Sequence, residues 1–283
     1  MSEHAGRPRP FRQVDVFTET ALHGNPVAVV HDSVGLTTER MHAFTDWTNL
    51  SECTFLAPPS HPDADYAVRI FCPGRELPFA GHPTLGTCHA WLEAGGVPRG
   101  DVVVQECAAG LVRIRREDSR LAFAAPPLLR GGPLDESDVV LIAHGLGIDR
   151  GDIVDHQWCH NGPPWRSVLL ASAGEVLALR PDASLLNGLD VGVVGPHPAG
   201  SLAHIEVRAF FTKGTAVEED PVTGSLNAAL AQWLIASGRV PPSYVAAQGT
   251  ALGRSGRVHV QEDGDDIWIG GHCVSVLDGT AVI

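Results

Sequence analysis

Three side chains in this sequence, Glu52, His82 and Asp220, have the chemistry needed to move protons. Glu52 lies in a weakly polar run, residues 49–56, where burial would disfavour its charged form and raise its pKa. A carboxyl group tuned in this way can act as a general acid or base near neutral pH. The alternative interpretation is a glutamate at a strand edge that faces water. If the three side chains meet, one can remove a proton from a carbon atom and another can return it.

A short repeated pattern places two of these residues in equivalent positions. Residues 82–92 and 220–230 both read acid/base residue, Pro, two spacers, Gly, hydroxyl residue, two spacers, Ala, one spacer, Leu. His82 and Asp220 begin the two copies, which lie 138 positions apart, about half the chain. Related tetrapeptides precede the copies, Val68-Arg69-Ile70-Phe71 and Val207-Arg208-Ala209-Phe210. The repeat predicts two similar domains, with a duplication kept only for packing as the alternative.

Each copy of the pattern also predicts the start of a helix. Pro suits the first helical turn, Gly permits close backbone approach, and Thr87 or Ser225 can cap the helix that follows. The two helices should end at Gly95-Gly96 and at Gly238. Free N–H groups and the positive end of the helix dipole favour anions, so two helix starts across a cleft could hold a carboxylate-bearing substrate. Ser225 could then hydrogen-bond the substrate or Asp220.

The composition indicates one large or two ordinary globular domains, with 283 residues of which 44% are hydrophobic and 19% charged. A formal net charge of −13, without a basic run, argues against nucleic-acid binding. We expect no membrane span, because no run of 18 apolar residues exists, and no secretory signal, because residues 1–10 lack an apolar core. Six cysteines without a C-x-x-C pair favour reduced thiols and a cytoplasmic protein.

The tightest cluster of potential metal ligands is formed by His156, Cys159 and His160. A helical histidine pair at i and i+4 could bind a metal, but Gly162-Pro163-Pro164 follows at once and no distant ligand set is evident. We therefore interpret the cluster as part of a loop and expect no metal site.

Residue patterning predicts mixed α and β structure along the chain. Capping signals predict helices at 37–48 and 136–146, the second ending near Gly147, and residues 176–179 are ambiguous between strand and helix. Apolar runs bounded by turn signals predict strands at 11–17, 27–30, 50–56, 66–71, 102–104, 111–114, 121–123, 165–171, 205–211, 258–260, 267–269 and 273–277.

A segment rich in Gly and Pro, residues 126–133, divides the chain. We predict a first domain at 1–127 and a second at 134–269. Strands outnumber helices and few strand–helix–strand units repeat regularly, so the predicted fold class is α+β rather than a doubly wound parallel sheet.

The motifs together resemble the PhzF (phenazine biosynthesis) family. The similarity is carried by residues 49–55, by 69–71 with 76–83, by 219–225, and by 14–17 followed by 24–26. Several separate motifs occur in one order, and the resemblance spans nearly the whole chain.

This resemblance implies a fold like that of diaminopimelate epimerase. The expected architecture has two pseudo-equivalent α+β domains, each a mixed sheet wrapped around a central helix, with the active site in the cleft between them. The last strand, about 270–283, would return to the first domain. The family resemblance also implies a homodimer.

The resemblance further implies a reaction and its residues. The namesake enzyme isomerises trans-2,3-dihydro-3-hydroxyanthranilate without a cofactor. By position, Glu52 matches the acid/base that shuttles a proton between carbon atoms. The other polar and backbone positions of the family's site fall on His82, Asp220, Ser225, Gly81 and Gly224. We therefore expect a cofactor-independent isomerase of a small unsaturated carboxylate.

Three other classes of protein are alternatives. The related two-thiol amino-acid epimerases place a cysteine before the glycine of each motif, whereas here Ala80 precedes Gly81 and Thr223 precedes Gly224. That mechanism is therefore disfavoured. A non-catalytic small-molecule-binding protein that retains the fold is the second alternative, although it would have no reason to hold all three proton-transfer residues. A serine hydrolase is weaker still, because no G-x-S-x-G pattern occurs.

Overall fold

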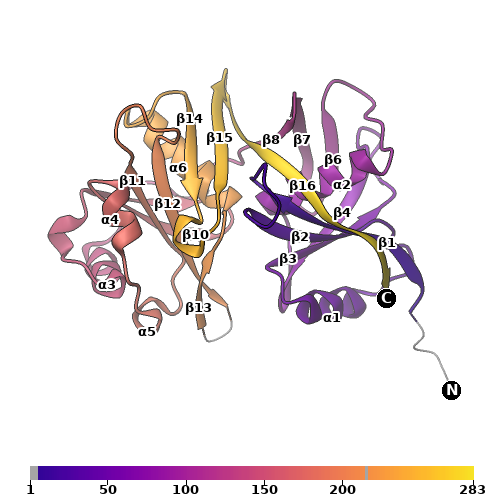
Figure 1. Cartoon of the computed structure of the whole chain (residues 1–283), viewed down its shortest axis with the longest axis horizontal. Coiled ribbons are helices and arrows are strands. Elements are labelled where there is room, and N and C mark those ends of the chain that lie inside the picture. Colours follow the sequence, from indigo (N-terminus) through magenta and orange to yellow (C-terminus); the bar gives the residue numbers. More distant parts are fainter. Residues whose placement is uncertain (1–5, 214–215) are drawn as a thin grey trace. The chain divides into compact units, whose positions relative to one another are not determined.

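The computed structural model describes residues 6–213 and 216–283, which form two compact units (Figure 1). The first unit comprises the chain up to Ala124 together with Gly270–Ile283, and the second comprises Ala125–Ile269. Elements of the first are β1 (Pro8–Val16), β2 (Asn25–Val30), α1 (Thr38–Thr48), β3 (Glu52–Ala57), β4 (Tyr66–Cys72), β5 (Arg75–Leu77), α2 (Gly81–Glu93), β6 (Val103–Cys107), β7 (Gly110–Glu117) and β8 (Arg120–Ala124). Elements of the second are α3 (Glu136–Leu146), η1 (Arg150–Asp152), β9 (Asp155–His160), β10 (Pro164–Leu169), α4 (Ala173–Ala178), α5 (Ala183–Leu186), β11 (Val191–Pro196), β12 (Ile205–Lys213), β13 (Ala216–Asp220), α6 (Gly224–Ala236), β14 (Ser243–Gln248), η2 (Thr250–Leu252) and β15 (Gly256–Asp263). β16 (Asp266–Val282) begins in the second unit and ends in the first.

The sheet of the first unit closes on itself. Its hydrogen-bonded order is β1-β2-β3-β4-β6-β7-β8-β16, and β16 also pairs with β1. The pairs β2–β3 and β4–β6 are parallel, and a helix connects the two strands of each pair. Closure turns the strands into a barrel with an enclosed interior.

α2 fills the interior of this barrel. Its buried residues include Leu85, Cys88 and Ala90 and surround the helix rather than forming one stripe, which is typical of a central helix. A Cβ atom at Gly86 would lie 2.3 Å from Cγ1 of Val27, so the helix backbone approaches β2 too closely for any side chain there.

α1 lies outside the strands of the first unit (Figure 1). The Thr37 side chain caps it by accepting a hydrogen bond from the Arg40 N–H group, which confirms the predicted helix. Met41 and Phe44 of α1 pack against an apolar cluster of β2, β3 and β4 that includes Phe55. Since the barrel has α2 inside and α1 outside, both faces of these strands are apolar.

The second unit repeats the strand pattern of the first. Its order is β9-β10-β11-β12-β14-β15-β16, with β13 paired to β12. The parallel pairs are β10–β11 and β12–β14, in the places that β2–β3 and β4–β6 occupy in the first unit. The two units are therefore two versions of one α+β topology.

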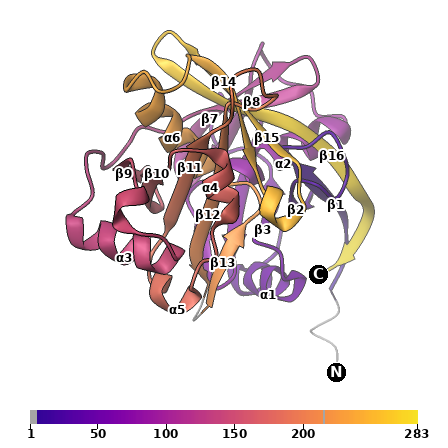
Figure 2. The same ribbon diagram turned by 60° about the vertical axis from the view of Figure 1, so that its left-hand side comes forward.

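α6 is the central helix of the second unit. It is buried on nearly all sides, and Leu226 packs against β11 at Gly192, where a Cβ would lie 2.6 Å from the leucine. α3, α4 and α5 cover the opposite face through a cluster that includes Ile142, Leu186 and Val193 (Figure 2). The predicted α+β fold, with a mixed sheet around a central helix in each of two similar units, is confirmed.

Several local predictions are confirmed and others are wrong. α3 spans the predicted residues and ends at Gly147, which has a φ of 73°. The predicted strands 267–269 and 273–277 are one continuous strand, β16, and residues 176–179 lie mainly in a helix, α4. His156, Cys159 and His160 belong to strand β9 rather than to a loop, because they pair with β10. Within the described ranges, no helix combines the length and apolarity needed to cross a membrane.

Candidate active site

The two central helices show how the repeated motifs correspond. α2 and α6 each have 13 residues, beginning at Gly81 and Gly224. In each case a glycine with positive φ follows two residues after the helix ends, at 95 and 238. Gly81 therefore corresponds to Gly224, and His82 corresponds to Ser225.

The predicted equivalence of His82 and Asp220 is consequently wrong. Asp220 is the last residue of β13 and lies before α6, where its counterpart is Leu77 at the end of β5. The pattern matched the spacing Pro-x-x-Gly in a shifted frame, because that spacing occurs twice around the start of α2, at Pro78 and at Pro83.

The same shift explains why the predicted helix caps are wrong. Thr87 lies in the middle of α2, where its buried hydroxyl donates to Thr54 Oγ1 at 2.8 Å. Ser225 is the second residue of α6 rather than its cap. The N-cap residues are Ala80 and Thr223, and neither side chain accepts a hydrogen bond from its own helix. The starts of both helices thus lack a side-chain cap.

An ion pair precedes each central helix in the same place. Arg69 binds Glu76 through two hydrogen bonds of 2.7 and 2.6 Å, and Arg208 binds Glu219 through two of 2.9 and 2.7 Å. Each guanidinium also lies 5.0 Å from the ring of the phenylalanine two residues further along the strand. These bidentate pairs fix the hairpins β4–β5 and β12–β13 from which the helices begin.

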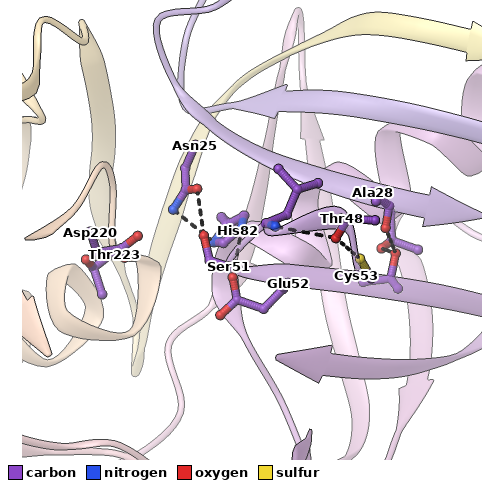
Figure 3. Close-up of polar contacts among 12 residues, drawn as sticks. Asn25, Ala28, Thr48, Ser51, Glu52, Cys53, His82, Asp220 and Thr223 are labelled. Carbon is purple, nitrogen blue, oxygen red and sulfur yellow. Dashed lines mark hydrogen bonds and ion pairs between the residues drawn. The ribbon is translucent and has the colours of Figure 1, made fainter. Parts of the chain in front are cut away.

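Glu52 and His82 lie side by side in the first unit (Figure 3). Oε2 of Glu52, at the start of β3, is 3.3 Å from Nε2 of His82, the second residue of α2. Their side chains are 17% and 6% exposed, respectively. Burial lowers the pKa of His82 to about 3. The imidazole is therefore neutral at neutral pH, so its 3.3 Å contact with Glu52 is not an ion pair between two charged groups.

Asn25 contacts the other nitrogen of the imidazole ring. Nδ2 of Asn25, the buried first residue of β2, lies 3.3 Å from Nδ1 of His82. Oδ1 of Asn25 accepts from the Ser51 hydroxyl at 3.5 Å (Figure 3). In the tautomer with its proton on Nε2, Nδ1 of His82 can accept from the Asn25 amide. The sequence indicated Asn25 only as part of the 24–26 motif, with no role of its own.

Asp220 forms a second polar group with Thr223 (Figure 3). The Thr223 hydroxyl donates to Oδ2 of Asp220 at 2.5 Å. Gln248, which is fully buried at the end of β14, donates to the same hydroxyl at 2.9 Å. Thr223 and Gln248 were not predicted from the sequence, because the pairing joins residues 25 positions apart.

Ser225 is held by two neighbours in the second unit. Its Oγ accepts from the Trp165 indole N–H group at 3.1 Å, and its carbonyl accepts from Nδ2 of Asn161 at 2.8 Å. Trp165 is buried and packs within the unit. Since the indole occupies only the acceptor side of the hydroxyl, Ser225 can still donate a hydrogen bond.

The cysteines do not have the properties of catalytic thiols. Burial raises the pKa of the Cys53 thiol to about 11 and the pKa values of Cys88 and Cys159 to about 12. All six cysteines are free of disulfides. In the part of the chain that the structure describes, no group of three His, Cys, Asp or Glu side chains could hold a metal ion.

Comparison with known proteins points to one family. A family model described as phenazine biosynthesis-like protein (PhzC-PhzF) matches residues 14–279. The chain is 33% identical over 305 residues to antisense-enhancing sequence 1 of Schizosaccharomyces pombe, with 100% of both chains covered. It is 33% identical over 257 residues to a trans-2,3-dihydro-3-hydroxyanthranilate isomerase of Pseudomonas aeruginosa, with 89% of each chain covered. Its fold is similar to that of a predicted epimerase from Pseudomonas aeruginosa, with a TM-score of 0.80, 26% identity, and coverage of 97% of this chain and 99% of that chain. The fold implied by the sequence motifs is thereby confirmed.

Proposed function

Because this chain belongs to the phenazine biosynthesis-like (PhzC-PhzF) family, we propose that it is a cofactor-independent isomerase. Its reaction is a proton shift between two carbon atoms of a small unsaturated carboxylate. The observation that carries the proposal is the 3.3 Å contact between Glu52 and His82, a partly exposed carboxyl group beside a buried, neutral imidazole.

Glu52 supplies both halves of the proton shift. As a carboxylate it takes a proton from an allylic carbon, and the electrons of that C–H bond delocalise into the conjugated system. The carboxylic acid so formed gives the proton to a different carbon, which moves the double bond and regenerates the carboxylate. One C–H bond breaks and one forms, so the reaction needs no oxidant and no reductant.

His82 assists as a neutral neighbour of the Glu52 carboxyl group. Its low pKa, caused by burial, prevents it from taking the proton from Glu52 and keeping it as an imidazolium. The imidazole instead lies beside the Glu52 carboxylate, with Nε2 3.3 Å from Oε2, while Asn25 contacts its Nδ1.

The remaining predicted site residues have binding roles in this proposal. Gly81 and Gly224 begin their helices, and their backbone N–H groups suit a substrate carboxylate. Ser225 retains a hydroxyl proton to donate, and Asp220 accepts from Thr223. Asp220 serves as a second charged group for a polar substituent of the substrate.

The first test of the proposal is a substrate screen followed by NMR. The lead compound is trans-2,3-dihydro-3-hydroxyanthranilate, since a relative of 33% identity is named for its isomerisation. Small unsaturated amino and carboxylic acids complete the set. Formation of a rearranged product supports the isomerase. Binding of these compounds without any turnover or hydrogen exchange would contradict it and favour a small-molecule-binding protein. Exchange confined to the α-carbon of an amino acid, with racemisation, would favour an epimerase.

A further inference from the structure

A buried glutamine supports the central helix in each unit. Gln105 lies on β6 and Gln248 on β14, the strands that follow α2 and α6, and neither is exposed to solvent. Gln105 donates to Thr84 Oγ1 at 3.0 Å, and Gln248 accepts from Asn227 Nδ2 at 2.8 Å. Thr84 and Asn227 are each the fourth residue of their helix, so the same support occurs twice.

Gln248 makes three further contacts, all toward the segment that carries Asp220. Its Oε1 accepts from the Thr223 backbone N–H group at 3.0 Å. Its Nε2 donates to Thr223 Oγ1 at 2.9 Å and to the Asp220 backbone carbonyl at 3.1 Å. In the first unit, alanine at position 80 replaces threonine, so no hydroxyl is available there. Gln105 instead accepts from the Tyr66 hydroxyl at 3.1 Å.

These contacts determine the direction of the Thr223 hydroxyl proton. A hydroxyl group has one proton to donate. Because an N–H group of Gln248 occupies an acceptor position of Oγ1, that proton is directed to Oδ2 of Asp220, 2.5 Å away. A hydrogen bond to a carboxylate stabilises its charged form. The chain of contacts therefore runs from the amide through the hydroxyl to the carboxylate.

We propose that Gln248 is a positioning residue that keeps Asp220 oriented and ionised through Thr223. Its catalytic consequence rests on the proposed isomerase function, in which Asp220 belongs to the site. Gln105, which contacts the fourth residue of its own central helix as Gln248 does but not the segment that carries Asp220, is the matched control.

Substitution by glutamate tests the donor role of the amide with little change in shape. In Gln248→Glu the N–H donors are replaced by an acceptor, so the Thr223 proton turns toward Glu and away from Asp220. Asp220 loses a hydrogen bond and gains a carboxylate neighbour, and both changes favour its protonated form. Gln105→Glu makes the same chemical change where Asp220 is not involved.

The experiment follows the Asp220 carboxyl carbon by NMR in protein labelled with ¹³C-aspartate, with the signal assigned by its loss in Asp220→Asn. The titration midpoint should rise by about one pH unit or more in Gln248→Glu and stay unchanged in Gln105→Glu. Thr223→Val, which removes the hydroxyl itself, should raise it as well. An unchanged midpoint in either the glutamate or the valine variant would overturn the proposal.

This readout needs no substrate, so it stands apart from the test of function. With an active substrate, kcat of Gln248→Glu should fall by about tenfold or more, and KM should change less. The acidic limb of the plot of kcat against pH should move to higher pH. Thr223→Ser keeps the hydroxyl, so its dependence of kcat on pH should match the wild type, whereas that of Thr223→Val should not. A wild-type protein that turns over no compound would contradict the isomerase while leaving the carboxyl titration to decide the role of Gln248. A loss of stability in Gln248→Glu without any shift of midpoint or pH profile would show a purely structural glutamine.

Discussion

Oε2 of Glu52 lies 3.3 Å from Nε2 of His82, and burial lowers the pKa of that histidine to about 3. A carboxyl group usually gives its proton to a neighbouring histidine, and the carboxylate and imidazolium then form an ion pair. Here the buried imidazole cannot become charged near neutral pH, so a proton taken up by Glu52 stays on Glu52. This pairing makes Glu52 suited to both receive and return a proton during one reaction.

The first prediction concerns the pH dependence of folding stability. The unfolded chain binds a proton at His82 near pH 6.5, whereas the folded chain does so only near pH 3. Between these values the unfolded state holds more protons, so His82 lowers stability as the pH falls and has no such effect above pH 6.5. Relative to His82→Asn, the wild type should lose about 1.4 kcal/mol per pH unit within this window.

Urea unfolding of both proteins between pH 4 and 8 measures that difference. The substitution itself adds a constant offset, so only the change of the difference with pH is informative. If the free energies of unfolding of the two proteins changed in parallel with pH, His82 would not be a neutral, buried residue.

The second prediction concerns the thiols. Cys53, Cys88 and Cys159 have pKa values raised to about 11 or 12 by burial, so few of them are thiolates at neutral pH. Alkylation of the folded protein at pH 7 should be slow and should leave turnover largely intact. Rapid loss of activity that substrate prevents would instead support a thiol mechanism.

The third prediction separates two roles of Ser225. Ser225→Ala removes a hydroxyl proposed to bind substrate and also the acceptor of the Trp165 indole. Trp165→Phe removes only the indole donor. We expect kcat/KM to fall by about tenfold in Ser225→Ala and much less in Trp165→Phe, while both lose about 1–3 kcal/mol of stability. Equal losses of kcat/KM would mean that Ser225 acts only through packing.

The fourth prediction concerns the packing of α2 against β2. A Cβ added at Gly86 would lie 2.3 Å from Cγ1 of Val27. Gly86→Ala should therefore destabilise the protein by about 1–3 kcal/mol, as overpacking of a buried core does. Gly100→Ala is the control, because a Cβ at Gly100 meets no atom within 4 Å. Equal urea midpoints for the two variants would show that α2 and β2 can move apart enough to accept the added methyl group.

Local signals in the sequence predicted the elements well where one residue fixes one feature. Thr37 caps α1 and Gly147 ends α3, as capping rules imply. The frame of the repeat was harder to predict, because two overlapping Pro-x-x-Gly spacings surround the start of α2 and only the helix boundaries distinguish them. In the structure His82 and Ser225 are each the second residue of their helix, so His82 corresponds to Ser225 and not to Asp220.

The polar partners of the candidate residues were not predictable from the sequence. Asn25 contacts His82 across 57 positions, and Gln248 contacts Thr223 across 25. Such contacts depend on strand order and register, which a single sequence does not determine. Asn25 belonged only to the 24–26 motif and Gln248 to no predicted element, and nothing in their types signalled a role beside a carboxylate.

The most direct test of the account is turnover by Glu52→Gln in D₂O, followed by ¹H NMR beside the wild type and Glu39→Gln, an acidic residue on the surface of α1 that serves as control. We predict that the wild type and Glu39→Gln form the rearranged product, which carries solvent deuterium at the newly protonated carbon to the extent that protonated Glu52 exchanges with D₂O before it returns its proton. Glu52→Gln should bind the substrate with similar affinity and turn it over about a thousandfold more slowly. Wild-type rate and deuterium incorporation in Glu52→Gln would contradict the assignment of Glu52 as the acid and base.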